Sequence, residues 1–463
     1  MSRRVQALVA DIGSTTTLVS AFDGLDSDEP RLLGQGAAAT SVLQGDVRAG
    51  LGAAISVLEE KLGQRLEWDH FLASSSAAGG LKMTVHGLVK DMTVRAAREA
   101  ALGAGANIHL VTAGKLGPED LEDIHATQPN ILLLAGGVDY GEKETVLHNA
   151  EQIADKGPDC PVIYAGNVAA RSRIERILGG GHRRLYIVDN VYPAIDRLEV
   201  ESSRRVIQEV FEAHITEAPG MAGIRELVGG RIVPTPGAVM DAARLLREDL
   251  GDLAVIDVGG ATTDIHAVCE DSDEFGRLLI APEPLARRSV EGDLGTFVSR
   301  LSVLDAEPGT SRRIATQLNI DETELQARLA GLPAVPETDD EKELAGVLAR
   351  ESARLALERH AGRIRTLYGP TGKTRIAEGK DLTGIGILVA TGGALTLLPD
   401  RIARLGGVLR SFRADLLVPS PGVPLAFDNH YVMAAAGVLS TRWPQGALAL
   451  IKASLADGQE VPV

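Results

Sequence analysis

The hydrophobic pattern divides the chain into short apolar runs, which predict strands, and longer stretches of helical period. Residues 5–41 predict a three-stranded meander, and a helix over 47–62 then leads to a strand that runs into Ser74. From about residue 107 the pattern changes to alternating strands and helices. The expected strands are 108–112, 131–135, 161–165 and 184–188, and the expected helices are 118–127, 143–154 and 169–178. Such alternation predicts a βαβ-type subdomain with a parallel sheet.

The second half begins with a helix over 239–250 and returns to strands from Leu253. Residues 296–368 are largely of helical period, including a long helix over 341–367 that is charged on one side and rich in alanine and leucine on the other. A late strand over 386–390 and a last helix over 429–439 complete the pattern.

Two of the predicted strands end in the same motif. LAVIDVGGATTDI begins at Leu253, and VADIGSTTTL begins at Val9. In each, an apolar strand reaches an aspartate, a glycine follows two residues later, and a Thr-Thr pair comes next. Asp11 and Asp257 are separated by 246 residues (257 minus 11), and the glycine and both threonines keep this offset. One D-x-G turn is ordinary hairpin chemistry. Two at a constant offset indicate a duplicated domain.

The motif has the chemistry of a phosphate site. Glycines let the backbone approach a ligand closely, and successive N–H groups in such a turn form an anion-binding nest. A carboxylate at the strand end beside the nest suits a hydrated Mg²⁺ on a polyphosphate. We therefore expect two phosphate loops that face each other across a cleft.

Composition narrows the function classes. The chain has 463 residues, 44% of them hydrophobic but only 3% aromatic, so its cores are expected to be aliphatic. The net charge of −16 argues against nucleic acid or an anionic membrane as a partner. The two cysteines, Cys160 and Cys269, form no CxxC pair and predict no zinc site or iron–sulfur cluster. With no signal peptide and no apolar stretch long enough to span a bilayer, we expect a cytoplasmic protein.

Two further motifs are expected to be decoys. Gly369-Pro-Thr-Gly-Lys-Thr374 resembles a Walker A loop but lacks its first glycine, since position 367 is leucine, and it follows a predicted helix. We interpret it as an exposed hairpin. Asp123-Ile-His125 and Asp264-Ile-His266 begin like the D-x-H-x-x-G loop of corrinoid proteins, but neither has the final glycine.

With two D-x-G turns and a late strand that ends in Gly-Gly, the chain resembles the actin, chaperone-ATPase and sugar-kinase superfamily. The resemblance implies an α/β fold of duplicated actin-like ATPase (ribonuclease H-like) lobes that binds ATP and Mg²⁺. Asp11 and Asp257 would organise the hydrated metal and would be the catalytic candidates, with Glu291 a third candidate for orienting water. The implied contacts are Gly13, Ser14, Thr15 and Thr16 in the first phosphate loop, Gly259, Gly260, Ala261 and Thr262 in the second, and Thr391, Gly392 and Gly393 in an adenosine turn.

A closer resemblance spans nearly the whole chain. ASSSAAGGLKM, LLLAGGVDYG, PTPGAVMDAA, RSVEGDLG and LVATGGAL are similar to segments of the accessory proteins of adenosylcobalamin-dependent glutamate mutase. This family is also called MutL and is distinct from the mismatch-repair proteins of that name. It implies an ATP-driven reactivating factor that opens a B12 mutase so that damaged cobalamin can leave.

The predicted organisation follows from both arguments. The first actin-like lobe is expected over 1–105, an inserted Rossmann-like α/β subdomain over 106–193, the second lobe with a helical insert over 194–455, and a tail over 456–463. The inserted subdomain is the expected contact for the mutase subunits. A small-molecule kinase and an actin-like nucleotide-dependent scaffold remain alternatives on the same fold.

Overall fold

The computed structural model describes residues 2–41, 47–77, 81–89, 100–101, 104, 106–194, 197–216, 221–228, 232–279, 284–369 and 372–456. The chain forms two compact units. One consists of Met1–Gly79, Ile215–Ser289 and Asp293–Val463, and the other of Gly80–His214 and Val290–Gly292. Apart from Ala456, the predicted tail lies outside the described residues.

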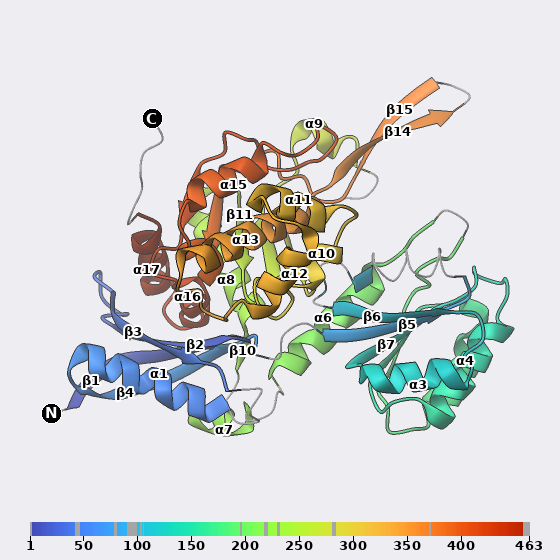
Figure 1. Cartoon of the computed structure of the whole chain (residues 1–463), viewed down its shortest axis with the longest axis horizontal. Helices are drawn as coiled ribbons and strands as arrows, with labels where there is room; N and C mark the ends of the chain where they lie inside the picture. Colours follow the sequence, from blue (N-terminus) through green and yellow to red (C-terminus); the bar gives the residue numbers. More distant parts are fainter. Residues whose placement is uncertain are drawn as a thin grey trace. The chain divides into compact units, whose positions relative to one another are not determined.

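The first unit contains two five-stranded sheets with the same topology (Figure 1). The first sheet has the order β10-β4-β1-β2-β3, and the second has the equivalent order β17-β16-β11-β12-β13. In both, an antiparallel hairpin (β1–β2, β11–β12) has a parallel strand (β4, β16) beside its first strand. The strands are β1 (Ser2–Ile12), β2 (Thr16–Asp23), β3 (Arg31–Ala39), β4 (Arg65–Ser75), β10 (Val233–Pro234), β11 (Leu253–Val258), β12 (Thr263–Val268), β13 (Ala286–Glu291), β16 (Ile387–Thr391) and β17 (Leu425–Phe427).

The register of the two hairpins is also the same. Asp11 lies opposite Leu18 on β2, and Asp257 lies opposite Asp264 on β12, so the 246-residue offset holds for both partners (257 minus 11 and 264 minus 18). This repeated topology confirms the predicted fold class of duplicated actin-like lobes.

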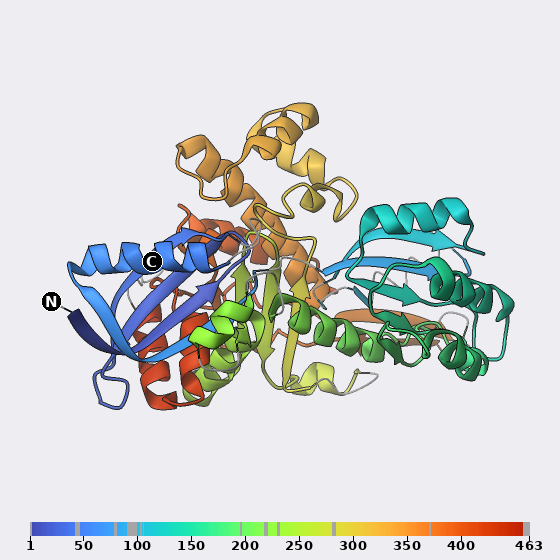
Figure 2. The same cartoon turned by 90° about the horizontal axis from the view of Figure 1, so that it is seen from below.

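Three hydrophobic cores fill the first unit. One face of the first sheet packs against α1 and α7 (Figure 2), and one face of the second packs against a helical layer that includes α11, α12, α13 and α15. The third core joins both sheets to α8, α16 and α17. The helices are α1 (Val47–Leu62), α7 (Met221–Leu227), α8 (Thr235–Leu250), α9 (Asp273–Gly276), α10 (Ser302–Asp305), α11 (Thr310–Leu318), α12 (Glu322–Gly331), α13 (Asp339–His360), α14 (Gly393–Thr396), α15 (Arg401–Leu409), α16 (Met433–Ser440) and α17 (Pro444–Ala456).

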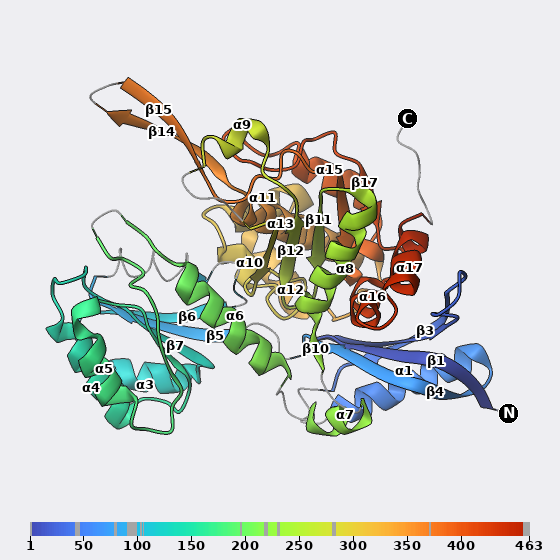
Figure 3. The ribbon, with the colours of Figure 1, turned by 180° about the vertical axis from the view of Figure 1, so that it is seen from behind.

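The second unit is a parallel sheet of order β6-β5-β7-β8-β9 with helices around it (Figure 3). This is the doubly wound order of flavodoxin-like folds, and it confirms the Rossmann-like character of the insert. Apolar residues of α3, α4 and α5 pack on β7 and β8. The elements are β5 (Leu81–Gly87), β6 (Ala106–Ala113), α3 (Pro118–Thr127), β7 (Ile131–Leu134), α4 (Glu144–Lys156), β8 (Val162–Tyr164), the short 3-10 helix η2 (Val168–Ala170), α5 (Arg171–Leu178), β9 (Leu185–Ile187) and α6 (Glu201–Thr216).

Three predicted elements differ from the structure. The long helix predicted over 341–367 ends at His360, and β14 (Arg363–Gly369) follows it and pairs with β15 (Gly372–Glu378). The described residues of the Walker-like sequence lie in this hairpin as expected, with Gly369 at the end of β14 and residues 372–374 at the start of β15, so the sequence does not directly follow a helix. The helix predicted to be the last is followed by another, α17. Among the described residues, no helix combines the length and the apolar character that crossing a membrane requires.

Candidate functional site

The two D-x-G turns of the first unit have matching geometry. The Gly13 N–H donates to the Thr16 carbonyl at 3.0 Å, and the Gly259 N–H donates to the Thr262 carbonyl at 2.9 Å. The turns also touch each other, because a Cβ added to Gly260 would lie 2.7 Å from Thr15 Cγ2. The first and second predicted phosphate loops are thus in direct contact, and glycine is required at position 260 for this approach.

The backbone amides of the second turn are oriented by a segment that sequence reasoning did not single out. The Thr296 and Phe297 amides donate to the carbonyls of Gly259 and Gly260, at 3.1 and 2.9 Å, and the Ser299 hydroxyl donates to the Ala261 carbonyl at 2.7 Å. In a trans peptide the carbonyl and the following N–H point in opposite directions. Since these three carbonyls point toward residues 296–299, the N–H groups that follow them in the loop point to the opposite side. An anion-binding nest requires such N–H groups that are free to face a ligand.

Asp11 is buried and held by two hydroxyl groups. It lies at the end of β1, is 7% exposed, and its Oδ1 accepts from Ser74 and from Thr235, each at 2.8 Å. Burial raises the pKa of Asp11, although these two hydroxyls lower it. Ser74 and Thr235 were not predicted as site residues, because they enter through β4 and the start of α8, far from Asp11 in the sequence.

Asp257 lies at the equivalent place on β11 but has a different environment. No described residue donates a hydrogen bond to its carboxylate, and Gly392 packs against it so closely that a Cβ at position 392 would overlap Asp257 Oδ1. Burial, together with the neighbouring carboxylates of Asp11 and Asp428, raises the pKa of Asp257 to about 7. Gly392 has a φ of 88°, which also favours glycine. The predicted adenosine turn and both aspartates are therefore brought together.

Asp428 and Tyr431 also belong to this site and were missed. Asp428 is fully buried after β17, where it accepts from the Thr391 and Ser454 hydroxyls at 2.9 and 2.6 Å. It also accepts from the amides of Val432 and Met433 at the start of α16. Burial and the charges of Asp11, Asp257 and Asp428 raise the pKa of Tyr431 well above its ordinary value. Its φ of 50° is unusual for a residue with a side chain.

A hollow lies beside the Gly392–Gly393 turn. It is formed by one face of α13 and by α14 and α15, and its lining includes Ala349, Arg350, Ala353, Ala394, Leu395 and Leu398. Three arginines, Arg350, Arg401 and Arg404, border the hollow beside these small and apolar side chains, and its volume of about 10 Å³ is that of about one water molecule. Ala394, which follows the Gly392–Gly393 turn directly, lines the hollow and places it next to that turn.

The donor set at the two aspartates fits a hydrated divalent cation. The described residues include no group of three His, Cys, Asp or Glu side chains that could enclose a metal ion. Burial, and after it the charges of Asp11 and Asp428, raises the pKa of Asp257, so three carboxylates share this part of the site. Mg²⁺ commonly keeps several waters and binds one or two carboxylates together with substrate phosphates. Asp11 and Asp257 match that pattern.

Comparison with known proteins identifies the family. The family model for "MutL protein" matches residues 7–455. The chain is also 36% identical over 466 residues to "Protein MutL" of Clostridium tetanomorphum, covering 96% of this chain and 98% of that protein. The chain belongs to the MutL family. This confirms the resemblance to the glutamate mutase accessory proteins.

Solved structures show only distant similarity. A nucleotide-free acetone carboxylase covers 94% of this chain and 70% of its own, with a TM-score of 0.40 and 13% identity. A nucleotide-free diol dehydratase-reactivating factor covers 94% of this chain and 99% of its own, with a TM-score of 0.36 and 11% identity. TM-scores below 0.5 are too low to indicate a shared function, so the sites of this MutL protein rest on its own geometry.

The remaining motifs lie elsewhere or have structural roles. His125 is exposed on α3, where its ring contacts the Lys156 carbonyl at 2.6 Å. Asp264 and His266 are buried within β12, and Glu291 is buried at the end of β13. Burial, followed by the charge of Arg288, lowers the pKa of His266 well below its ordinary value. Asp264 and His266 are therefore core groups of the second sheet rather than parts of a corrinoid site, and the role of Glu291 in orienting water stays a prediction.

Proposed function

We propose that this protein is an ATP-hydrolysing reactivating factor for an adenosylcobalamin-dependent mutase of the glutamate mutase type. The observation that carries the proposal is the meeting of two equivalent D-x-G turns with Asp11, Asp257 and Gly392 inside the first unit. Membership of the MutL family supplies the biological setting, a factor that works beside such a mutase.

The two phosphate loops would bind the polyphosphate of ATP. The contacts are the backbone N–H groups and hydroxyls of Gly13, Ser14, Thr15 and Thr16 and of Gly259, Gly260, Ala261 and Thr262, and the supporting geometry is the contact between Thr15 and Gly260. N–H groups that are already oriented stabilise charge developing on the transferred phosphoryl group without further reorganisation.

The two aspartates would have different roles. Asp11 is fixed by Ser74 and Thr235, so its free oxygen would hold a metal-bound water in a defined place. The Asp257 carboxylate receives no hydrogen bond from the described residues and can therefore accept one from the attacking water. Mg²⁺, when bound through water to both carboxylates, would neutralise charge on the phosphates.

The adenosine would lie over the hollow beside Thr391, Gly392 and Gly393, which would have to widen from its volume of about 10 Å³ to take the base. Its base would lie against Ala349, Ala353 and the backbone after the turn. This placement puts the base on α13 and the phosphates on the two hairpins, so one nucleotide would contact both sheets of the first unit. Such a contact is what lobe closure on ATP and opening after hydrolysis require.

The decisive experiment measures Mg²⁺-dependent phosphate release and mutase recovery together. Glutamate mutase inactivated with bound hydroxocobalamin is incubated with the wild-type protein, ATP, Mg²⁺ and free adenosylcobalamin, and its activity is followed. Asp257→Ala is the test variant. Asp252→Asn, a half-buried aspartate just before β11 that pairs with Arg247 at 2.9 Å, is the matched control.

We expect phosphate release and mutase recovery with the wild type and the control, and loss of both with Asp257→Ala. Phosphate release without recovery of the mutase would reject the reactivating role and favour a kinase or another ATPase on this fold. ATP binding without turnover in any condition would favour the scaffold alternative.

A further inference from the structure

The hairpin of β14 and β15, here called the basic arm (Arg363–Glu378), is not explained by nucleotide binding. It is a separate two-stranded sheet that extends away from the helices and main sheet of its own lobe (Figures 1 and 3). Two-stranded hairpins are marginally stable alone in water, so an ordered one needs support from other groups. In this protein the base of the arm supplies such support.

The base of the basic arm is anchored to the second lobe by backbone hydrogen bonds. The Ile364 amide donates to the Asp415 carbonyl at 2.8 Å, and the Ala377 amide donates to the Leu278 carbonyl at 2.7 Å. Ala377 is fully buried. The arm therefore leaves the lobe from a fixed origin.

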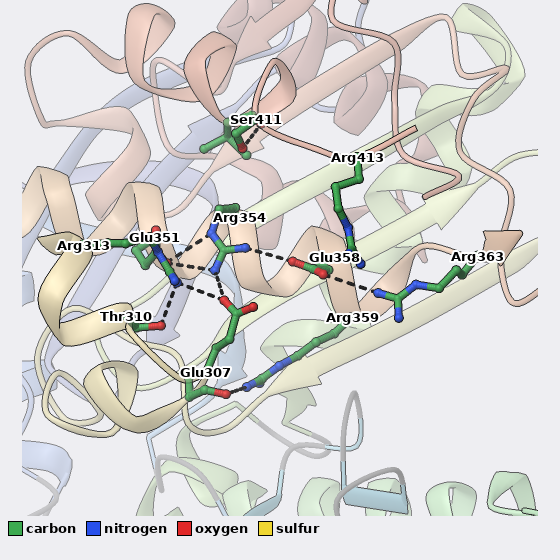
Figure 4. A network of polar contacts seen from close by, with 12 residues as sticks. Glu307, Thr310, Arg313, Glu351, Arg354, Glu358, Arg359, Arg363, Ser411 and Arg413 are labelled. Atoms are coloured by element: carbon green, nitrogen blue, oxygen red, sulfur yellow. Dashed lines mark hydrogen bonds and ion pairs between the residues drawn. The ribbon is translucent and has the colours of Figure 1, made fainter. Parts of the chain in front are cut away.

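An ion-pair network on α13 reinforces this origin (Figure 4). Arg363, the first residue of the arm, pairs with Glu358 at 3.4 Å, and Arg354 donates to the same carboxylate at 2.9 Å. Arg354 also binds Glu351 at 2.9 Å and Glu307 at 2.6 Å. Since α13 also lines the hollow of the candidate site, the arm is built onto the helix that would contact the nucleotide.

The distal half of the basic arm is exposed on both faces. Residues 365–367 and 372–375 are all exposed, and neighbouring residues of a strand point to opposite faces. Leu367, at the distal end of β14, is 51% exposed. Leu367 therefore places one apolar side chain among the charges of the arm, where a protein partner could bury it.

The charge of the arm is opposite to that of the chain. Its sequence, RIRTLYGPTGKTRIAE, has four basic residues and one acidic residue, a net charge of +3, whereas the whole chain has −16 and the remainder therefore −19 (−16 minus +3). Arg363 pairs with Glu358 and Arg365 with Glu378, so Lys373 and Arg375 carry the positive charge of the distal half. We propose that the basic arm is a docking element for an acidic surface of the mutase that this protein serves. The proposal rests on the proposed function and adds the surface through which the partner is held.

A protein surface fits this charge distribution better than a polyanion does. Nucleic acid or an anionic membrane extends its negative charge over a large area and would be repelled by the −19 of the remaining chain. A local acidic patch on a folded protein meets only the arm, and Leu367 can then be buried at the contact.

The test compares charge reversal on the arm with an equal reversal elsewhere. Lys373→Glu/Arg375→Glu changes two exposed residues of the arm. Arg31→Glu/Arg312→Glu changes two exposed residues of the same unit that lie outside the arm, with the same change in net charge. Binding to glutamate mutase holoenzyme is measured at 0.1 and 0.5 M salt, together with ATPase activity in the absence of mutase.

We expect the arm variant to bind the mutase at least about tenfold more weakly than the wild type at 0.1 M salt, and the control variant to bind like the wild type. Both variants should keep the wild-type basal ATPase rate. Equal mutase binding by the arm variant and the wild type would overturn the arm proposal alone. A wild-type protein that does not bind the mutase would instead contradict the proposed function, and arm-dependent binding to RNA or to phosphatidylserine vesicles without mutase binding would overturn the docking proposal.

A proximity measurement tests the arm without altering its charge. The only two cysteines, Cys160 and Cys269, are buried, so Thr374→Cys adds a single exposed thiol at the arm. A polarity-sensitive fluorophore on that thiol should respond to saturating mutase, whereas the same label on Thr316→Cys, an exposed position on α11, should not. An unchanged signal at position 374 on a mutase complex that demonstrably forms would overturn the proposal.

Discussion

Replacing Asp257 by asparagine should stabilise the nucleotide-free protein and remove its response to Mg²⁺ and ATP. The reason is that burial, and after it the charges of Asp11 and Asp428, raises the pKa of Asp257 from 3.8 to about 7. A full shift of this size would correspond to about 4 kcal/mol. Because the side chain is partly exposed, solvent screens much of the repulsion, and we expect a gain of about 1–2 kcal/mol at pH 8.

The pH dependence has a definite sign. Between about pH 4 and pH 7 the folded protein keeps a proton on Asp257 that the unfolded chain has already lost. Stability should therefore fall as the pH rises through this window, and the cost should be fully present above pH 7. The Asp257→Asn variant lacks this contribution, so its advantage over the wild type should be largest at pH 8 and should vanish near pH 4.

Thermal unfolding at pH 5 and pH 8, with and without Mg²⁺ and ATP, separates the two effects. Nucleotide at one hundred times its Kd should stabilise the wild type by about 2.7 kcal/mol, and the Asp257→Asn variant should gain almost nothing. Asp428→Asn is the contrasting control. Asp428 accepts four hydrogen bonds, and the amide of an asparagine cannot accept all of them. The free energy of unfolding of this variant should therefore be about 1–3 kcal/mol lower than that of the wild type.

Two results would refute the reasoning. If Asp257→Asn were less stable than the wild type at pH 8 without nucleotide, Asp257 would be a structural acceptor rather than a repelled carboxylate. If the variant kept the full response to Mg²⁺ and ATP, the assignment of Asp257 to the nucleotide site would be wrong.

The remaining predictions concern packing and the ion-pair network of the first unit. Gly437→Ala should lower the free energy of unfolding, measured by chemical denaturation, by about 3 kcal/mol, because the new Cβ would overlap the Ala238 carbonyl where α16 crosses α8. Gly407→Ala in α15 should raise the same free energy by about 0.5–1 kcal/mol, because a Cβ there would meet no atom within 4 Å. Glu351→Gln should lower the free energy of unfolding by about 1–2 kcal/mol, since the Glu351 side chain is 9% exposed and accepts hydrogen bonds from Arg313 and Arg354 at 2.7 and 2.9 Å. The exposed pair of Glu324 with Arg328 should tolerate Glu324→Gln within about 0.5 kcal/mol.

The sequence predicts the parts of the site that are repeated. In each D-x-G hairpin the aspartate, the glycine and the threonines lie within a few residues of one another. A duplication copies such a local structure intact, so the two hairpins keep a constant offset in the sequence. The strands beside them do not keep that offset. Ser74 on β4 lies opposite Asp11, and Thr391 on β16 lies opposite Asp257, but they are 317 residues apart (391 minus 74). Segments of different length inserted into the two lobes hide this equivalence.

Residues that complete the site were missed for the same reason. Thr235 reaches Asp11 across 224 positions of the chain, and Asp428 follows a three-residue strand that carries no motif. Only the pairing of the strands brings them to the aspartates. The β14–β15 hairpin was assigned partly to a helix because the charged pattern of α13 continues into Arg363 and Arg365, and the turn between His360 and Arg363 has no proline to mark the boundary.

The two halves of the site have the same backbone but divide the polar contacts unequally. Asp11 receives the Ser74 and Thr235 hydroxyls, whereas the equivalent hydroxyl beside Asp257, that of Thr391, donates instead to Asp428. Asp257 is therefore the carboxylate whose negative charge is left for a cation or a water molecule to balance. A duplicated fold with identical contacts would bind nucleotide symmetrically and gain no preferred site for the attacking water. On the function proposed above, the Asp257 carboxylate, which lacks the threonine hydroxyl, would orient the attacking water, and this asymmetry is why Asp257, rather than Asp11, is the residue to change first.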